Sequence, residues 1–194
     1  MEISADKFGQ ILFIVYWAIW GILALRPRDR RTWWLESVTP VVIFPFLFWI
    51  NNLGLLSKTS SIIILIFALL HVTAARYVYA SMPFGNWIKK RLSLGRNNYD
   101  RFVHFSYGVL MVPVFYSLLS SFLPEANILR SIFAFTIVVS VGSVYEILEY
   151  AAAIMFGKND SAGFLGMQGD IWDTQKDMLA QTIGALISLL FLIS

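Results

Sequence analysis

The longest apolar stretch of the chain is Ile128–Phe156, which reads ILRSIFAFTIVVSVGSVYEILEYAAAIMF. No charged residue lies between Arg130 and Glu146, and the apolar residues form a continuous block instead of the one-sided stripe of a soluble helix. About 20 apolar residues are enough for a helix to cross the hydrocarbon core of a bilayer. The stretch therefore predicts a membrane-spanning helix that is longer than the bilayer requires and that tilts or projects beyond it.

Five further segments have the same apolar character. With the first, the predicted spans are Phe8–Leu25, Val38–Leu56, Ser60–Tyr79, Phe102–Phe122, Ile128–Phe156 and Thr174–Ser194. Hydrophobic residues make up 58% of the chain and charged residues only 14%, whereas a soluble domain carries about a quarter charged residues. We therefore predict an all-α, polytopic membrane helix bundle of about six transmembrane helices, forming a single integral membrane domain over residues 1–194.

The lysines and arginines are distributed unevenly between the two sets of alternating loops. One set holds 12 of the 15: Arg26, Arg28, Arg30, Arg31, Arg76, Lys89, Lys90, Arg91, Arg96, Arg101, Lys158 and Lys176. The other set, with the N-terminal segment, holds Lys7, Lys58 and Arg130. Cytoplasmic loops carry the excess of basic residues in membrane proteins. We therefore expect the first set to be cytoplasmic and both chain termini to lie outside.

Several classes of function are excluded or disfavoured by composition. The chain has no cysteine, which excludes disulfides, thiolate nucleophiles and Cys-type zinc sites. Its basic residues fall in short loops and do not form the aromatic-interleaved basic surface of a nucleic-acid-binding protein. Glu2 and Asp6 outnumber Lys7 before the first apolar run, so we expect that run to be a retained span and not a cleaved signal peptide. Membrane lipids are the expected partners.

A small set of ionisable residues lies within the predicted spans or at their ends. They are His71, Asp100, His104, Glu146, Glu149, Asp170, Asp173 and Asp177. Charges inside a bilayer are costly and tend to mark function. Three pairs in this set have helical spacing, which places each pair on one face about 4.5–6 Å apart along the axis. The pairs are Asp100 with His104, Glu146 with Glu149, and Asp173 with Asp177.

These residues are expected at similar depths in the membrane, near the same end of the bundle, although the spans run in alternating directions. Asp100 and Asp173 open their spans at the expected cytoplasmic end, while His71 and Glu149 lie about 12 Å inside that end at 1.5 Å per residue. We therefore expect the set to converge in one acidic pocket. Carboxylates gathered there repel one another, and protonation, an arginine such as Arg76 or a bound cation must neutralise them. Arg101 is the second arginine within reach of such a pocket.

Imidazole together with carboxylate is a ligand set that suits Zn, Mn or Fe, and carboxylate alone suits Mg, Mn or Ca. We predict a divalent metal cation (Zn, Mn or Mg) and no other cofactor. The candidate ligands are His71, Asp100, His104, Glu146, Glu149, Asp173 and Asp177, and the candidate catalytic residues are Glu146, Asp173 and His104.

Structural alternatives exist for most of these residues. The aspartates also suit helix N-caps or first-turn dipole pairing, and the histidines suit interhelical hydrogen bonds. Glu146 and Glu149 lie within an apolar span and cannot cap a helix. The structural alternative to metal binding for them is an ion pair with Arg76 or Arg101. The segment Gly163–Gly169 contains several glycines, which indicates a flexible loop. The alternative is that its free backbone N–H groups bind a phosphate.

Four stretches of the sequence resemble a known family. They are His71…Arg76-Tyr77-Val78-Tyr79…Met82-Pro83-Phe84, Arg96-Asn97-Asn98-Tyr99-Asp100-Arg101-Phe102-Val103-His104-Phe105, Tyr145-Glu146-Ile147-Leu148-Glu149-Tyr150 and Gly169-Asp170-Ile171-Trp172-Asp173-Thr174-Gln175-Lys176-Asp177-Met178. They resemble the bacterial inner-membrane family typified by YjdF, and the order of the acidic motifs is more distantly similar to VanZ-like proteins. The resemblance implies a multi-pass protein of the bacterial inner (plasma) membrane. It supports the topology and the choice of residues and supplies no reaction.

Three functions are compatible with this sequence, and it predicts no oligomeric state. The first is a metal-dependent intramembrane hydrolase or transferase that acts on a lipid or polyprenyl-phosphate head group, which Lys89, Lys90 and Arg91 would help to attract. The second is a proton- or ion-coupled small-molecule transporter, although an off-centre cluster and the lack of an internal repeat count against it. The third is a non-catalytic membrane adaptor whose polar network holds the helices together.

Overall fold

The computed structural model describes residues 4–156 and 168–193, and no strand occurs within them. Their elements are α1 (Ala5–Ala24), α2 (Arg30–Asn52), α3 (Lys58–Tyr77), the 3₁₀ turn η1 (Tyr79–Ser81), α4 (Pro83–Arg91), α5 (Tyr99–Leu119), α6 (Asn127–Phe156) and α8 (Asp173–Ile193). By length and composition, α1, α2, α3, α5, α6 and α8 can each cross a membrane. The predicted all-α bundle of six spans is confirmed.

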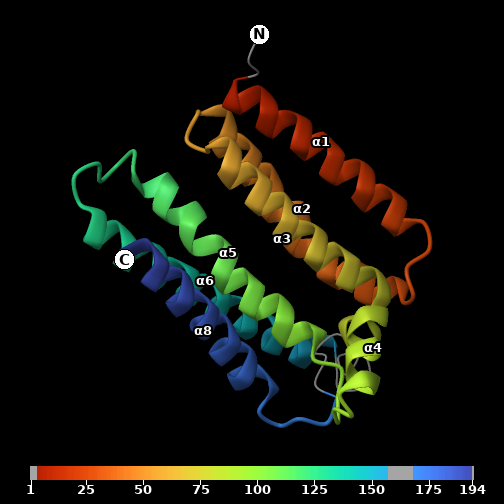
Figure 1. Ribbon diagram of the computed structural model, residues 1–194. Helices are drawn as coiled ribbons and strands as arrows, with labels where there is room; N and C mark the ends of the chain where they lie inside the picture. Colours follow the sequence, from red (N-terminus) through yellow and green to blue (C-terminus); the bar gives the residue numbers. More distant parts are fainter. Residues whose placement is uncertain (1–3, 157–167, 194) are drawn as a thin grey trace.

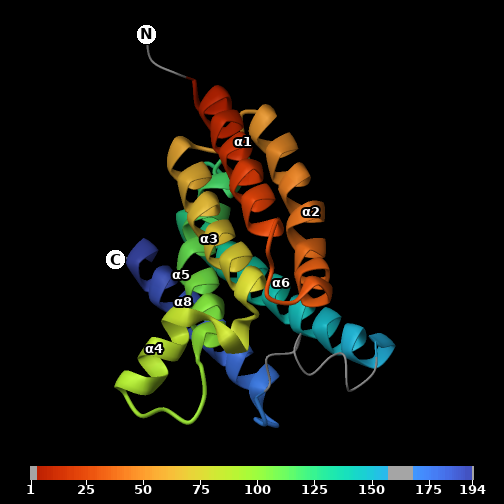
Figure 2. The ribbon, with the colours of Figure 1, turned by 90° about the vertical axis from the view of Figure 1, so that its right-hand side faces the viewer.

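The long helices form two groups of three (Figure 1). Helices α1, α2 and α3 pack together, α5, α6 and α8 pack together, and α3 against α5 joins the two groups. Helices α1, α3 and α6 end, and α2, α5 and α8 begin, at one end of the bundle, which also carries α4 (Figure 2). We call this the basic end, because the arginine-rich loops are located there. The side of the membrane that it faces stays a prediction based on those arginines.

Helix α2 begins at Arg30, two turns before the predicted start at Val38. The cause is a helix cap: the Asp29 carboxylate accepts a hydrogen bond of 2.7 Å from the Thr32 backbone N–H. The earlier start places Glu36 inside a membrane-spanning helix, where it is buried. The predicted boundary was wrong, and the error hid an acidic residue within the bundle.

Helices α5 and α8 approach each other closely because glycines face their shared surface. A Cβ atom added at Gly108 would lie 2.1 Å from the Gln181 carbonyl oxygen, and one added at Gly184 would lie 2.3 Å from the Phe105 carbonyl oxygen. Small residues of this kind let helix backbones pack against each other in membranes. The close contact fixes the starts of both helices side by side at the basic end.

Replacing Gly108 with Ala should destabilise the protein by about 1–3 kcal/mol, because the new methyl group forces two helix backbones apart. The measurement is the thermal unfolding midpoint of the purified protein in detergent. Gly21→Ala is the matched control, since a Cβ at Gly21 meets nothing within 4 Å. Equal unfolding midpoints for the two variants would show that α5 and α8 accommodate the methyl group without loss of stability, and would contradict the prediction.

Candidate functional site

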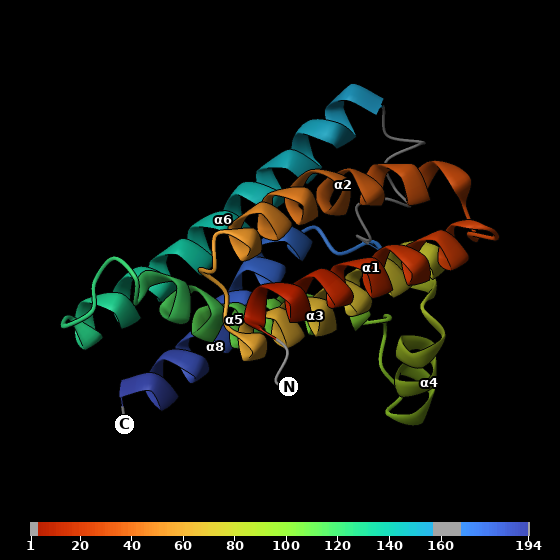
Figure 3. The same cartoon turned by 90° about the horizontal axis from the view of Figure 1, so that it is seen from above.

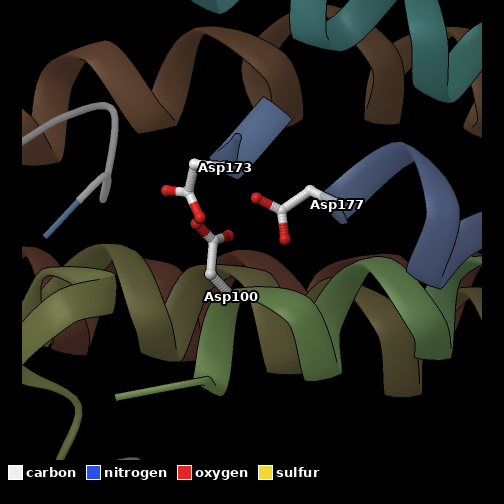
Figure 4. A group of neighbouring side chains, drawn as sticks. All are labelled: Asp100, Asp173 and Asp177. Carbon is white, nitrogen blue, oxygen red and sulfur yellow. The ribbon is translucent and has the colours of Figure 1, made fainter. Parts of the chain in front are cut away.

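Three aspartates meet at the basic end where α5 and α8 begin. One carboxylate oxygen from each of Asp100, Asp173 and Asp177 lies within 4.8 Å of the other two, and the three side chains point toward one another (Figure 4). Asp173 and Asp177 are each only 3% exposed, and Asp100 is half-buried. Because both helices start here, the positive ends of their dipoles also face the carboxylates and stabilise negative charge.

His104 extends this group toward α6. It lies one turn after Asp100, and its Nε2 atom is 3.7 Å from the Asp100 Oδ1 atom. The same nitrogen is 3.2 Å from the Glu146 Oε1 atom, and both side chains are buried. Five of the predicted residues therefore lie together, and we call them the acidic cluster: Asp100, His104, Glu146, Asp173 and Asp177.

Glu149 lies one turn beyond Glu146 on α6, at the edge of the acidic cluster. The residue is half-buried, and its carboxyl group is within electrostatic range of Asp100 and Glu146. The three-residue spacing keeps both glutamates on the inner side of the helix. Glu149 therefore adds to the negative charge of the site, and its role as a ligand stays a prediction.

Two arginines balance part of this charge. Arg96 forms a two-pronged ion pair with Asp173, in which its Nη2 atom donates to Oδ2 over 3.2 Å and its Nη1 atom contacts Oδ1. The Nη2 atom of Arg101 donates to Asp173 Oδ1 over 3.2 Å, and its Nε atom is 3.8 Å from Asp177 Oδ1. Asp173 is the carboxylate that the arginines hold most tightly.

Arg76, the other arginine predicted to face the acids, lies elsewhere. Its guanidinium donates to the backbone carbonyl of Leu23 over 2.9 Å and to that of Arg26. The Arg28 backbone N–H in turn donates to the Arg76 carbonyl over 2.8 Å. Arg76 therefore fastens the loop between α1 and α2 to the end of α3.

Asp170 precedes α8 and shares both arginines with the acidic cluster, since its Oδ2 atom also lies 3.6 Å from Arg96 Nη1. Its Oδ2 atom accepts hydrogen bonds from Lys176 Nζ over 2.7 Å and from Arg101 Nη2 over 2.6 Å. Its Oδ1 atom accepts from the Trp172 backbone N–H over 3.1 Å. The Lys176 bond first, and the Arg101 bond second, hold the pKa of this carboxyl well below its usual range. Asp170 supports the turn before α8.

The structure does not bring His71 into the acidic cluster, because both of its ring nitrogens have other partners. The Nε2 atom lies 3.1 Å from the Glu36 carbonyl oxygen, which only accepts, so this nitrogen carries the proton. The Nδ1 atom then accepts from the Tyr79 hydroxyl over 2.7 Å. Burial raises the pKa of Tyr79 well above its usual value, which keeps the hydroxyl a donor. Metal ligation by His71 through Nδ1 would require the Tyr79 bond to break, while Nε2 could keep its bond to the Glu36 carbonyl.

Glu36 is the buried acid that the sequence analysis missed. It is 2% exposed, its Oε2 atom lies 3.9 Å from His71 Nε2, and the Tyr145 hydroxyl donates to the same oxygen over 3.4 Å. We call Glu36, His71, Tyr79 and Tyr145 the polar network. It joins the two three-helix groups, since Glu36 and His71 come from one group and Tyr145 from the other. The capping signal at Asp29 was the clue in the sequence that places Glu36 within a helix.

The spacing of the acidic cluster suits a divalent cation. Ligand distances of about 2.0–2.2 Å place two oxygens on one cation about 3–4.4 Å apart, so the 4.8 Å limit requires only small side-chain movements. The Asp177 Oδ1 atom is buried and accepts no hydrogen bond from the residues that the structure describes. Four carboxyl groups of the cluster face two arginines, which leaves negative charge for a cation or protons to neutralise.

Residues 157–167 lie outside the described part of the chain. The predicted phosphate-binding alternative at Gly163–Gly169 therefore falls almost entirely outside it, as does Lys158. The first residue that the structure describes after this gap is Gln168, whose Nε2 atom donates to the Asn97 carbonyl over 2.8 Å. Its Oε1 atom accepts from the Asn97 backbone N–H over 3.0 Å. This pair of bonds fixes the approach to α8 beside the start of α5.

Comparison with known proteins adds a family relationship. A family described as "Predicted membrane protein (DUF2238)" matches residues 8–194. The inner membrane protein YjdF of Escherichia coli (strain K12) is 30% identical over 168 residues, which cover 85% of this chain and 79% of that protein. No solved structure matches the chain. The resemblance to the YjdF family is confirmed, and the more distant likeness to VanZ-like proteins has no support in these matches.

Proposed function

Since the chain belongs to the DUF2238 family of predicted membrane proteins and is a multi-pass inner-membrane protein, we propose that its acidic cluster binds a divalent cation and cleaves or transfers the phosphate of a lipid head group. The observation that carries the proposal is the meeting of Asp100, Asp173 and Asp177 within 4.8 Å beside His104 and Glu146. A bound cation supplies a Lewis acid at such a site.

The residues of the cluster divide by their partners. Asp100 and Asp177 supply carboxylate oxygens, and Asp173 is held in position by Arg96 and Arg101. His104 and Glu146 are in mutual contact, and this pair is suited to take up and release the proton of an attacking water or acceptor hydroxyl. Glu146 and His104 are therefore the proposed acid–base residues, and Asp173 is a metal ligand or a positioning residue.

Two features favour a lipid substrate. Helix α6 turns Ile147, Leu148 and Tyr150 outward, so the surface beside Glu146 faces the hydrocarbon of the membrane. Arg101 lies next to the carboxylates with its side chain 24% exposed, and guanidinium groups bind phosphate through paired hydrogen bonds. A head group arriving from the bilayer would meet both the arginine and the acidic cluster.

The test uses purified protein in nanodiscs that contain bacterial polar lipids and a polyprenyl diphosphate. Loss of the diphosphate is followed by mass spectrometry with Mg²⁺, Mn²⁺ or Zn²⁺ and after chelation, so that hydrolysis and transfer to another lipid are both detected. We expect metal-dependent loss that falls about 10²- to 10⁴-fold in Glu146→Gln. Glu125→Gln, in an exposed loop before α6, is the control and should keep full activity. No turnover by a metal-loaded wild-type protein would reject the proposed reaction.

Proton- or ion-coupled transport is the second candidate, and the polar network is the observation that favours it. Glu36 from α2 and Tyr145 from α6 meet where the two three-helix groups face each other, and alternating access moves such groups against one another. Proteoliposomes carrying a pH-sensitive dye would report proton flux that Glu36→Gln abolishes. Flux unchanged by Glu36→Gln would remove the support that this network gives to transport.

A further inference from the structure

Helix α4 has two unlike faces. On the inner face, a Cβ atom at Gly85 would lie 1.9 Å from Asn97 Oδ1, and Asn97 Nδ2 donates to Asn86 Oδ1 over 3.0 Å. On the outer face, Phe84 is 50% exposed and Trp87 is 62% exposed. The two rings stack with centroids 6.0 Å apart and planes at 17°. The helix therefore turns its aromatic side chains away from the protein.

The position of α4 fixes its depth relative to the bilayer. It lies at the basic end and points aside from the long helices (Figure 3). The membrane span α3 ends only a few residues before it, and the span α5 begins shortly after it. Asn97 also donates to the Met82 carbonyl over 3.1 Å, which holds the start of α4 against the start of α5. Helix α4 is thus held at the level where the spans leave the hydrocarbon.

The end of α4 carries a run of cations. Lys89, Lys90 and Arg91 occupy its last turn, and the side chains of Lys90 and Arg91 are exposed. Helices that combine exposed aromatic side chains with lysine and arginine lie in the membrane interface and bind anionic lipids. Tryptophan in particular is enriched at the level of the head groups.

We infer that α4 is an interfacial helix that places Phe84 and Trp87 into the bilayer surface and binds anionic phospholipid head groups through Lys89, Lys90 and Arg91. The occupant of its outer face is the leaflet at the basic end. Charge complementarity and the attachment to two spans that end at this level carry the inference. It is independent of the proposed metal chemistry, because neither α4 nor its basic residues belong to the acidic cluster.

The depth of α4 is measured with a spin label. The chain has no cysteine, so Phe84→Cys provides a unique attachment site and leaves Trp87 in place. In nanodiscs we expect the label to collide more often with oxygen, which partitions into lipid, than with a water-soluble nickel complex. Glu125→Cys, in an exposed loop at the opposite end of the bundle, should show the reverse preference. A label at position 84 that behaves like the one at 125, or that shows dipolar coupling to a second copy, would overturn the inference.

Lipid selectivity is measured by the phosphatidylglycerol that remains bound when nanodiscs of mixed phosphatidylcholine and phosphatidylglycerol are analysed by native mass spectrometry. The double variant Lys90→Gln/Arg91→Gln should bind phosphatidylglycerol about tenfold more weakly than the wild type. The matched control is Arg26→Gln/Arg28→Gln, which removes the same charge from exposed residues at the same end. Equal losses in the two double variants would show attraction by net charge alone and would refute a site on α4.

Discussion

Replacing Asp177 with Asn is expected to weaken the binding of Mn²⁺ or Zn²⁺ by at least about 100-fold, because it removes a carboxylate from the three that meet at the starts of α5 and α8. Loss even of groups that only orient metal ligands lowers affinity about 10- to 100-fold. Binding is measured by calorimetric titration of the metal-free protein and by elemental analysis after dialysis. Asp100→Asn should behave in the same way.

Asp29→Asn is the matched control for this substitution. Asp29 lies at the same end of the bundle and caps α2 through Thr32, and Asn caps helices as well as Asp does. The control should bind metal like the wild type. A wild-type protein that takes up no divalent metal, or an Asp177→Asn variant that binds as tightly as the wild type, would contradict the proposed site.

Thermal stability gives a second test of Asp177→Asn. The difference in unfolding midpoint between the variant and the wild type should have opposite signs in the metal-free and the metal-bound protein. Without metal, Asp177→Asn removes one of several neighbouring carboxylates that repel one another, so its unfolding midpoint should rise above that of the wild type. With metal, the wild type should gain stability by mass action and the variant should not. A residue that merely held the helices together would lower the midpoint in both conditions when replaced.

The parts of this arrangement that follow helical periodicity could be predicted from the sequence. Asp100 with His104, and Asp173 with Asp177, are each one turn apart, and the alternating direction of the spans places both pairs at one end. Glu146 followed from its depth within an apolar helix. These inferences needed only spacing and topology, which the sequence carries directly.

The remaining parts depend on contacts that spacing does not determine. Hydropathy alone places the start of α2 at Val38 and leaves Glu36 outside the predicted span, whereas the Asp29 cap decides where the helix begins. His71 lies on the expected helix, but its partners come from α2 and η1, and no sequence pattern links those segments. Arg96 lies in a loop, and only the tertiary fold shows that it reaches Asp173.

The Arg96–Asp173 ion pair gives the second large expected effect. Both side chains are nearly buried, at 12% and 4% exposure, so removing Arg96 leaves the Asp173 carboxylate with Arg101 as its remaining cation in the described part of the chain, among carboxylates that outnumber the arginines. Arg96→Met should therefore destabilise the metal-free protein by up to about 3–5 kcal/mol. Asp173→Asn in the same background should restore most of that loss, which a double-mutant cycle of unfolding free energies measures. Arg26→Met, at an exposed position, should change stability by less than about 0.5 kcal/mol.

Arg96→Met also distinguishes two ways of neutralising the carboxylates of the acidic cluster. Either the arginines and protons balance their charge, or a bound cation does. In Arg96→Met, Asp173 has lost its two-pronged partner, so its Oδ2 atom becomes available to a metal that shares Asp100 and Asp177, while Oδ1 still accepts from Arg101. Adding Mn²⁺ should then stabilise Arg96→Met more than it stabilises the wild type, because the cation replaces the missing guanidinium charge. If Mn²⁺ stabilises neither protein, the arginines and protons alone balance the carboxylates, and the acidic cluster is a structural ion-pair network.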